Sequence, residues 1–236
     1  MYYGWRAKIG LIIPAPGAAP EREFNNYAPE GVSILTQRIL FEKVDHNGLA
    51  ALGDRVVEAA KLVSTGKPDL LVFGCTTGSL IKGVGYDQEL SRRMEDATGI
   101  RAVTTSTAVL AALQALGAKR VVVSTPYSDE VNEAEKKFLE NNGFEVLCIK
   151  GLGYTDPIRM PRTTFDQMYH LTGEVLDSRA DVIFVSCTGL GIVDGVSMLE
   201  RDFQLPVITS NQTSLWYALR SLSIQDPLPL GRLFTL

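Results

Sequence analysis

The sequence predicts an α/β fold made of two pseudo-symmetric, Rossmann-like halves, each a mainly parallel sheet flanked by helices. Short apolar runs, typical of strands buried on both faces, alternate along the chain with segments of helical periodicity. In addition, the passage Asp69–Gly78 returns as Asp181–Gly189, and the apolar run of each copy ends on Cys-Thr. The cysteines of the two copies, Cys75 and Cys187, are 187 − 75 = 112 residues apart.

Other passages repeat in the same order. The apolar run that ends at Pro14 returns before Pro126, again 126 − 14 = 112 residues later. Ser106 and Ser210 follow matching short apolar runs and precede matching helical stretches. We therefore predict an N-terminal half over residues 1–117 and a C-terminal half over 118–236, with the last helix free to cross over. The alternative is that unrelated βαβ units look alike because buried strands draw on few residue types.

The apolar runs predict eight strands. In chain order these are Ile9–Pro14, Ser33–Phe41, Leu70–Gly74, Ala102–Thr104, Arg120–Ser124, Glu145–Ile149, Val182–Ser186 and Pro206–Ile208.

Helices are predicted between the strands. Leu49–Ser64 carries an apolar face at helical spacing, and Ser128–Asn142 opens with Ser-Asp-Glu and ends at Asn-Gly, which are good start and stop signals. The remaining predicted helices are Asp87–Thr98, Thr107–Leu116, Thr163–Ser178, Gly195–Phe203 and Thr213–Leu222. Two segments rich in proline and glycine, Ala15–Gly31 and Gly151–Arg162, are predicted to be long loops that could overhang a cleft.

Composition narrows the class of protein. With 236 residues and 45% hydrophobic content, the chain can bury a substantial core. A net charge of −4 gives no reason to expect a nucleic acid or an anionic membrane as partner. No apolar run approaches the ~20 residues that span a bilayer, and the N-terminus runs into a strand without a secretory signal. We expect a cytoplasmic protein, and the sequence leaves open whether it forms a homo-oligomer.

The cysteines are not arranged for a disulfide framework or a metal site. There are three of them, an odd number, and none has Cys-x-x-Cys or Cys/His spacing. Cys148 lies in an apolar stretch and is expected in the core. The sequence leaves open whether a cysteine meets His46 or His170 in space to form a catalytic Cys–His dyad. Because no glycine pattern fits a nucleotide either, we predict no metal and no cofactor.

Cys75 and Cys187 are the candidate catalytic residues. Each is predicted at the carboxyl end of a strand, where open α/β sheets hold their ligands. The backbone N–H groups that follow them, with the hydroxyls of Thr76, Thr77 and Thr188, could bind a carboxylate and stabilise an enediolate-like charge. Such donors also favour the thiolate. The bland alternative is that each cysteine is a small buried hydrophobe.

Several motifs together resemble the aspartate/glutamate racemase superfamily, within it the branch of maleate cis-trans isomerases and arylmalonate decarboxylases. They are Gly74-Cys-Thr-Thr-Gly78, Ser186-Cys-Thr-Gly189, Thr125-Pro-Tyr-Ser-Asp-Glu-Val-Asn132, Ser210-Asn-Gln212 and Gly231-Arg-Leu-Phe234. The resemblance implies that Cys75 and Cys187 are catalytic. It implies a substrate site formed by Pro14, Thr76, Thr77, Tyr127, Thr188, Gly189 and Asn211.

The resemblance also separates the activities. Maleate isomerases and amino-acid racemases of this superfamily use two cysteines, whereas arylmalonate decarboxylases have glycine where this chain has Cys75. The stretch Pro14-Ala-Pro-Gly17, in contrast, is closer to the decarboxylase pattern than to the Ser-Asn-Thr of maleate isomerases. We therefore predict a cofactor-independent isomerase of a small mono- or dicarboxylate, either maleate isomerase-like or racemase-like. The alternatives are a decarboxylase with Cys187 as proton donor and a non-catalytic carboxylate-binding protein.

Overall fold

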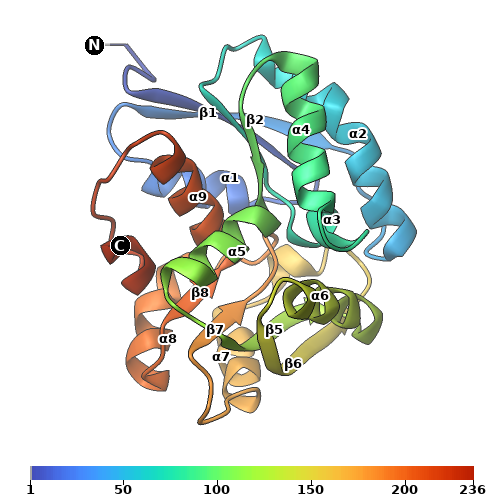
Figure 1. Ribbon diagram of the computed structural model, residues 1–236, viewed down its shortest axis with the longest axis vertical. Coiled ribbons are helices and arrows are strands. Elements are labelled where there is room, and N and C mark those ends of the chain that lie inside the picture. Colours follow the sequence, from blue (N-terminus) through green and yellow to red (C-terminus); the bar gives the residue numbers. More distant parts are fainter. Residues whose placement is uncertain (1) are drawn as a thin grey trace.

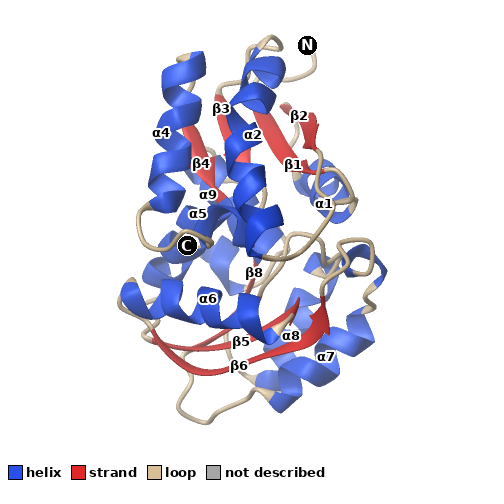
Figure 2. Cartoon of the chain, turned by 90° about the vertical axis from the view of Figure 1, so that its right-hand side faces the viewer, coloured by secondary structure: helices blue, strands red, loops and turns tan. Residues whose placement is uncertain are grey.

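The computed structural model describes residues 2–236 and contains two four-stranded sheets (Figures 1 and 2). The strand order is β2-β1-β3-β4 in one sheet and β6-β5-β7-β8 in the other, and every ladder is parallel. Adding four to each strand number converts the first order into the second. The predicted fold class is thereby confirmed, whereas the boundary at residues 117/118 stays a prediction.

The first sheet and its helices use the chain up to residue 115. The elements are β1 (Ala7–Pro14), α1 (Ala19–Tyr27), β2 (Val32–Ile39), α2 (His46–Ser64), β3 (Leu70–Phe73), α3 (Thr76–Leu80), α4 (Tyr86–Thr98), β4 (Ala102–Thr104) and α5 (Thr105–Ala115).

The second sheet and its helices follow. The elements are β5 (Arg120–Tyr127), α6 (Asp129–Asn141), β6 (Glu145–Tyr154), η1 (Met160–Arg162), α7 (Phe165–Glu174), β7 (Val182–Val185), η2 (Val193–Gly195), α8 (Val196–Phe203), β8 (Val207–Thr209), α9 (Ser210–Ser221) and η3 (Arg232–Thr235).

The equivalent helices α5 and α9 pack against each other between the two sheets (Figure 1). Both begin directly after a strand, and a threonine caps each: Thr104 accepts a hydrogen bond from Thr107 N–H, and Thr209 accepts one from Gln212 N–H. Each of the two hydrophobic clusters draws side chains from both halves, for example Ile12 with Ile183 and Leu70 with Phe184. Both clusters therefore extend across the two halves.

The structure corrects the predicted loop Ala15–Gly31, because helix α1 lies within it. Pro20 stands in the first turn of α1. There the missing N–H costs nothing, because the first N–H groups of a helix have no intrahelical partner. The proline that suggested a loop is thus compatible with a helix start.

The predicted loop Gly151–Arg162 also begins too early, since β6 continues through Gly151 to Tyr154. A Cβ at Gly151 would lie 2.1 Å from the backbone oxygen of Tyr127. Gly151 therefore marks a close approach between paired strands rather than a turn. Within residues 2–236, no helix combines the length and hydropathy needed to cross a membrane.

Candidate active site

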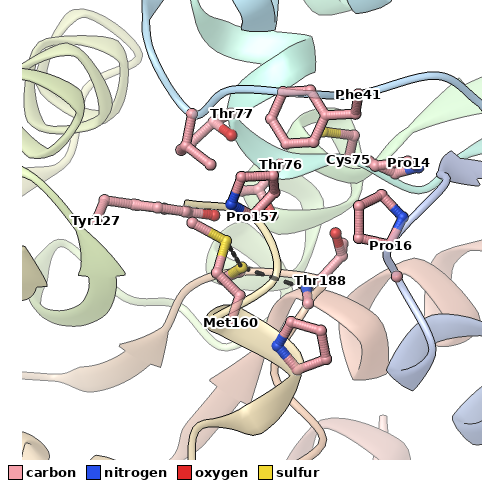
Figure 3. A pocket seen from close by; sticks show the side chains of 15 residues that line it. Pro14, Pro16, Phe41, Cys75, Thr76, Thr77, Tyr127, Pro157, Met160 and Thr188 are labelled. Carbon is pink, nitrogen blue, oxygen red and sulfur yellow. Dashed lines mark hydrogen bonds between the residues drawn. The ribbon is translucent and has the colours of Figure 1, made fainter. Parts of the chain in front are cut away.

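Six strands direct their carboxyl ends toward one pocket. Its empty space, including the part that is open to solvent, is about 430 Å³. Figure 3 shows the side chains around it. The segments after β1, β2, β3, β6 and β7, with the end of β5, supply the lining: Pro14, Pro16, Gly17, Phe41, Val44, Cys75, Thr76, Thr77, Tyr127, Pro157, Met160, Pro161, Cys187, Thr188 and Gly189. The pocket thus lies where parallel sheets place their ligand sites, and both halves contribute to it.

Cys75 follows β3 at the residue directly before the short helix α3, and its side chain is buried. Burial raises the pKa of its thiol to about 12, while the Gly78 N–H and the Thr77 hydroxyl favour the thiolate. A Cβ at position 78 would lie 2.8 Å from Cys75 Sγ. Glycine at this position lets the backbone donor reach the sulfur.

Cys187 follows β7 in a different backbone conformation. Its φ is +121°, whereas that of Cys75 is −149°. Such a φ is rare for a residue with a side chain, and conformations of this kind cost about 1–3 kcal/mol that the surrounding contacts must offset. The Gly189 N–H donates to Cys187 Sγ at 3.2 Å. The turn after Cys187 is therefore folded back onto its own sulfur.

Tyr127 reaches across the pocket with its hydroxyl toward the centre (Figure 3). Burial raises the pKa of Cys187 to about 11, and the nearby Tyr127 hydroxyl is the group that most opposes this increase. The pKa of Tyr127 itself lies well above its usual value, first because the ring is buried and next because Cys187 is close. Tyr127 is therefore a hydrogen-bond donor at neutral pH.

Thr76 is linked to the opposite strand end through Ser210, the first residue of α9. The Thr76 hydroxyl donates to Ser210 Oγ at 2.8 Å, and the Cys187 N–H donates to the same oxygen at 3.0 Å. All three residues are at most 6% exposed. Ser210 therefore joins the segment after β3 to the segment after β7.

The pocket has an apolar side. Phe41, Val44 and Met160 face it together with four proline rings, Pro14, Pro16, Pro157 and Pro161. Met160 Sδ lies 3.6 Å from Cys187 Sγ. Throughout residues 2–236, no arginine, lysine, histidine, aspartate or glutamate belongs to the lining.

Asn211 does not belong to the lining, although the resemblance implied that it binds substrate. Its side-chain NH₂ group donates to Glu23 Oε2 at 2.6 Å and to the Thr188 carbonyl at 3.0 Å. Glu23, on α1, also accepts from the Val193 N–H at 3.1 Å. In this structure Asn211 supports the loop after Cys187 from behind, and a direct contact with substrate stays a prediction.

Glu135 is a further buried acid behind the pocket. Its Oε1 accepts from the Ser186 hydroxyl at 2.6 Å, and its Oε2 has no hydrogen-bond partner in the part of the chain that the structure describes. Burial raises the pKa of this carboxyl to about 7, and burial raises that of Glu23 to about 7 as well. Each carboxylate would place a negative charge in the protein interior.

The structure brings eight of the nine predicted site residues into one pocket: Pro14, Cys75, Thr76, Thr77, Tyr127, Cys187, Thr188 and Gly189. Sequence reasoning missed the apolar side. Pro16 and Pro157 lie in the two segments predicted to overhang a cleft, and Phe41 ends a predicted strand, so position alone could have suggested them. Ser210 opens one of the family motifs, but its contacts with Thr76 and Cys187, like that of Glu135 with Ser186, join residues distant in sequence and gave no local signal. Among residues 2–236, no three His, Cys, Asp or Glu side chains are grouped to hold a metal.

Alkylation of Cys75 and Cys187 by iodoacetamide should become faster with pH. Both thiols have a raised pKa, about 12 and about 11, and only the thiolate reacts. We expect the rate to rise about tenfold per unit between about pH 7 and about pH 9. Peptide mapping by mass spectrometry gives each rate, with a Cys148→Ser variant to remove the third thiol. A rate that levels off below about pH 8 would contradict the raised pKa values.

The protein should lose stability as the pH rises from about 5 to about 8, because of Glu23 and Glu135. In the unfolded chain these carboxyls lose their protons near their ordinary pKa of 4.5, whereas burial in the folded state raises that pKa to about 7. The folded state binds more protons in this interval, so the free energy of unfolding falls there, by at most about 3 kcal/mol for each carboxyl.

Urea titrations across this pH range measure the effect. Glu135→Gln, which stays neutral, should flatten the decrease, whereas Glu133→Gln, on the exposed face of the same helix, should not. An unchanged pH dependence in Glu135→Gln would show that Glu135 is not the carboxyl responsible.

The chain matches known proteins over nearly its whole length. The family model described as arylmalonate decarboxylase matches residues 9–234. Arylmalonate decarboxylase of Bordetella bronchiseptica is 31% identical over 216 residues, which are 90% of this chain and 89% of that protein. A maleate isomerase of Pseudomonas putida is 23% identical over 235 residues, 94% of each chain. The structure of a cysteine-to-alanine variant of the maleate isomerase Iso of Pseudomonas putida S16 with maleate superposes with a TM-score of 0.93 at 22% identity, over 97% of each chain.

Proposed function

Since this chain belongs to the arylmalonate decarboxylase family, we propose that it is a cofactor-independent isomerase that acts on a small carboxylate with the thiols of Cys75 and Cys187. The observation that carries the proposal is that both cysteines line one pocket, from equivalent strands of the two halves. Arylmalonate decarboxylase-like chemistry requires only the second cysteine, whereas an isomerase needs a group on each face of the reacting carbon.

The donors on one side of the pocket suit a carboxylate. Thr76, Thr77 and Thr188 supply hydroxyls and Tyr127 a phenol, and the first N–H groups of α3 have no partner within the helix. When a carboxylate held here loses its α-proton, negative charge moves onto its two oxygens. Fixed donors aimed at those oxygens stabilise this charge more than that of the substrate.

The proton moves between the two thiols. One sulfur, as thiolate, takes the α-proton, and the C–H electron pair enters the carboxylate to give an enediolate. The other thiol donates its proton to the opposite face of the same carbon and becomes the thiolate. Cys187 is the thiol that ionises more easily, with a pKa of about 11 against about 12 for Cys75, because the Gly189 N–H donates to its sulfur and the Tyr127 hydroxyl lowers its pKa. After one turnover the charge lies on the other cysteine, so the enzyme works in both directions.

The apolar side of the pocket bears on the choice of substrate. A second carboxylate or an ammonium group pointing there would lose water without gaining a charged partner, since none lines the described pocket. Proton transfer at a carbon that carries an apolar substituent therefore fits better than isomerisation of maleate or of an acidic amino acid. In the maleate-type route, Cys75 thiolate would add to the double bond, the resulting single bond would rotate, and the thiolate would leave.

The same apolar side favours a second candidate function, decarboxylation of an arylmalonate. There the C–C bond to one carboxylate breaks, CO₂ leaves, and the electron pair forms the enediolate, which the Cys187 thiol protonates. The 31% identity with an arylmalonate decarboxylase supports this candidate. The presence of Cys75 weighs against it, because the decarboxylases that this chain resembles have glycine there.

A substrate panel tests the proposal. Chelated and dialysed protein is incubated in D₂O with single enantiomers of 2-arylpropionates, with maleate, aspartate and glutamate, and with arylmalonates. Proton NMR and chiral chromatography follow each acid. The proposed function predicts α-deuteration with loss of optical purity, abolished by iodoacetamide. Decarboxylation alone, unaffected by Cys75→Ala, would favour the second candidate, and loss of activity on chelation, restored by a divalent ion, would refute cofactor independence.

A further inference from the structure

Ser210 lies outside the pocket lining yet contacts both segments that carry the cysteines. Its Oγ accepts from the Thr76 hydroxyl at 2.8 Å and from the Cys187 N–H at 3.0 Å, and its side chain is fully buried. A hydroxyl oxygen has two lone pairs, so these two hydrogen bonds use its whole accepting capacity. The Ser210 proton remains available for donation.

The hydrogen bond from the Cys187 N–H to Ser210 Oγ holds the Cys187 backbone in its positive-φ conformation. Cys187 has a φ of +121°, which its own side chain disfavours, and its N–H lies inside the protein. Without Ser210 Oγ, this N–H would have lost its acceptor. The turn could then rotate, and the sulfur would move away from the Gly189 N–H and the Tyr127 hydroxyl.

The bond from Thr76 has a different consequence. Thr76 has one hydroxyl proton, and while it is donated to Ser210 it cannot be donated to a carboxylate in the pocket. If the Ser210 hydroxyl turns, it can donate to Thr76 Oγ1 and still accept from Cys187 N–H. The Thr76 proton is then free for the substrate. Only two hydroxyl rotations separate these arrangements.

We infer that Ser210 is a positioning residue, which holds the turn of Cys187 and at the same time releases the Thr76 proton to the bound carboxylate. The inference rests on the proposed two-thiol function, because it assumes a substrate carboxylate beside Thr76. Its first part, the hold on Cys187, concerns the protein without substrate and can be tested even if the substrate panel fails.

The first experiment measures alkylation of each cysteine by iodoacetamide at about pH 8, in Ser210→Ala and in the matched control Ser214→Ala. Ser214 lies one helical turn further along α9, is equally buried, and contacts Ser210 O and Thr105 without reaching a cysteine. In Ser210→Ala the Cys187 rate should fall at least about threefold, because its thiolate loses two donors, and Cys75 should be unaffected. In the control both rates should stay within about twofold of the original.

Two further variants separate the hydrogen bond from packing. Ser210→Thr keeps the hydroxyl and should restore the Cys187 rate. If Ser210→Ala does not fold, Ser210→Cys keeps the side-chain volume while accepting hydrogen bonds only weakly, and it should slow Cys187 in the same way. An unchanged or faster Cys187 in a folded Ser210→Ala protein, or equal slowing in Ser210→Thr, would overturn the inference.

The second experiment uses the substrate identified by the panel. In Ser210→Ala, the Thr76 hydroxyl no longer donates to Ser210 and is free to donate to the carboxylate, so KM should change less than about threefold. The turn of Cys187 is no longer held, so kcat should fall about tenfold or more. In Thr76→Val, which has lost the donor itself, KM should rise instead. Equal effects of the two variants on KM would show that Ser210 does not control the Thr76 proton.

Discussion

Replacing Cys75 with alanine should lower isomerase activity by at least about a thousandfold, because the substrate then has a proton carrier on one face only. A positioned acid or base contributes about 10²–10⁴ in rate. The other titratable side chains of the described pocket are Cys187, which serves the opposite face, and Tyr127, whose pKa lies well above its usual value. Cys75→Gly, the residue of the decarboxylases that this chain resembles, should lose isomerisation in the same way.

The loss has a stereochemical signature. With Cys187 intact, Cys75→Ala should still exchange the α-proton of one enantiomer with D₂O, but the deuterium should return to the face from which the proton left. Chiral chromatography coupled to mass spectrometry distinguishes this retention from inversion. Cys148→Ala is the control, since Cys148 lies on β6 outside the pocket lining. Full racemisation by purified Cys75→Ala protein would end the two-thiol mechanism.

Replacing Tyr127 with phenylalanine should lower kcat/KM about 10- to 100-fold and shift its pH dependence to higher pH. The Tyr127 hydroxyl is the largest influence that lowers the pKa of Cys187. A hydrogen bond to a charged group contributes about 1.5–3 kcal/mol, which corresponds to this range of rates. Because the pKa of Cys187 rises without the phenol, less thiolate is present at any pH below that pKa.

The pH profile of kcat/KM and the alkylation rate of Cys187 measure this effect. Tyr154→Phe is the matched control, because Tyr154 pairs with Tyr127 in the β5–β6 ladder but lies outside the pocket lining, with its ring under Arg159. It should change neither quantity. A Tyr127→Phe enzyme with an unshifted profile would show that the phenol acts on the substrate alone.

Much of the site follows from local patterns in the sequence. Four-residue apolar runs before Cys75 and Cys187 are buried at every position, as expected for strands covered on both faces. Parallel order then places both carboxyl ends at one edge of each sheet. The repeat, the fold class and the meeting of Cys75 and Cys187 with their neighbouring threonines in one pocket follow from these patterns. Pro14, Tyr127 and Gly189 were implied by the family resemblance, and they line the same pocket.

Other features depend on contacts that no local pattern encodes. Nearly identical Cys-Thr motifs adopt different backbones: α3 begins directly after Cys75, whereas Cys187 takes a positive φ that Ser210, 23 residues later, helps to hold. Asn211 lies in the expected motif, yet its side-chain NH₂ group donates a hydrogen bond to Glu23, 188 positions away.

The sequence by itself therefore determined the two strand-end thiols and the sheets that carry them, because burial and strand periodicity are properties of neighbouring residues. The tertiary structure alone decided the direction of Asn211, the backbone conformation of Cys187 and the apolar side of the pocket. Phe41, Met160 and Pro157 come from loops of different halves, and they form one surface only when the strands bring those loops together. A hydrogen bond or an apolar contact acts over a few ångströms in space, whatever the separation along the chain.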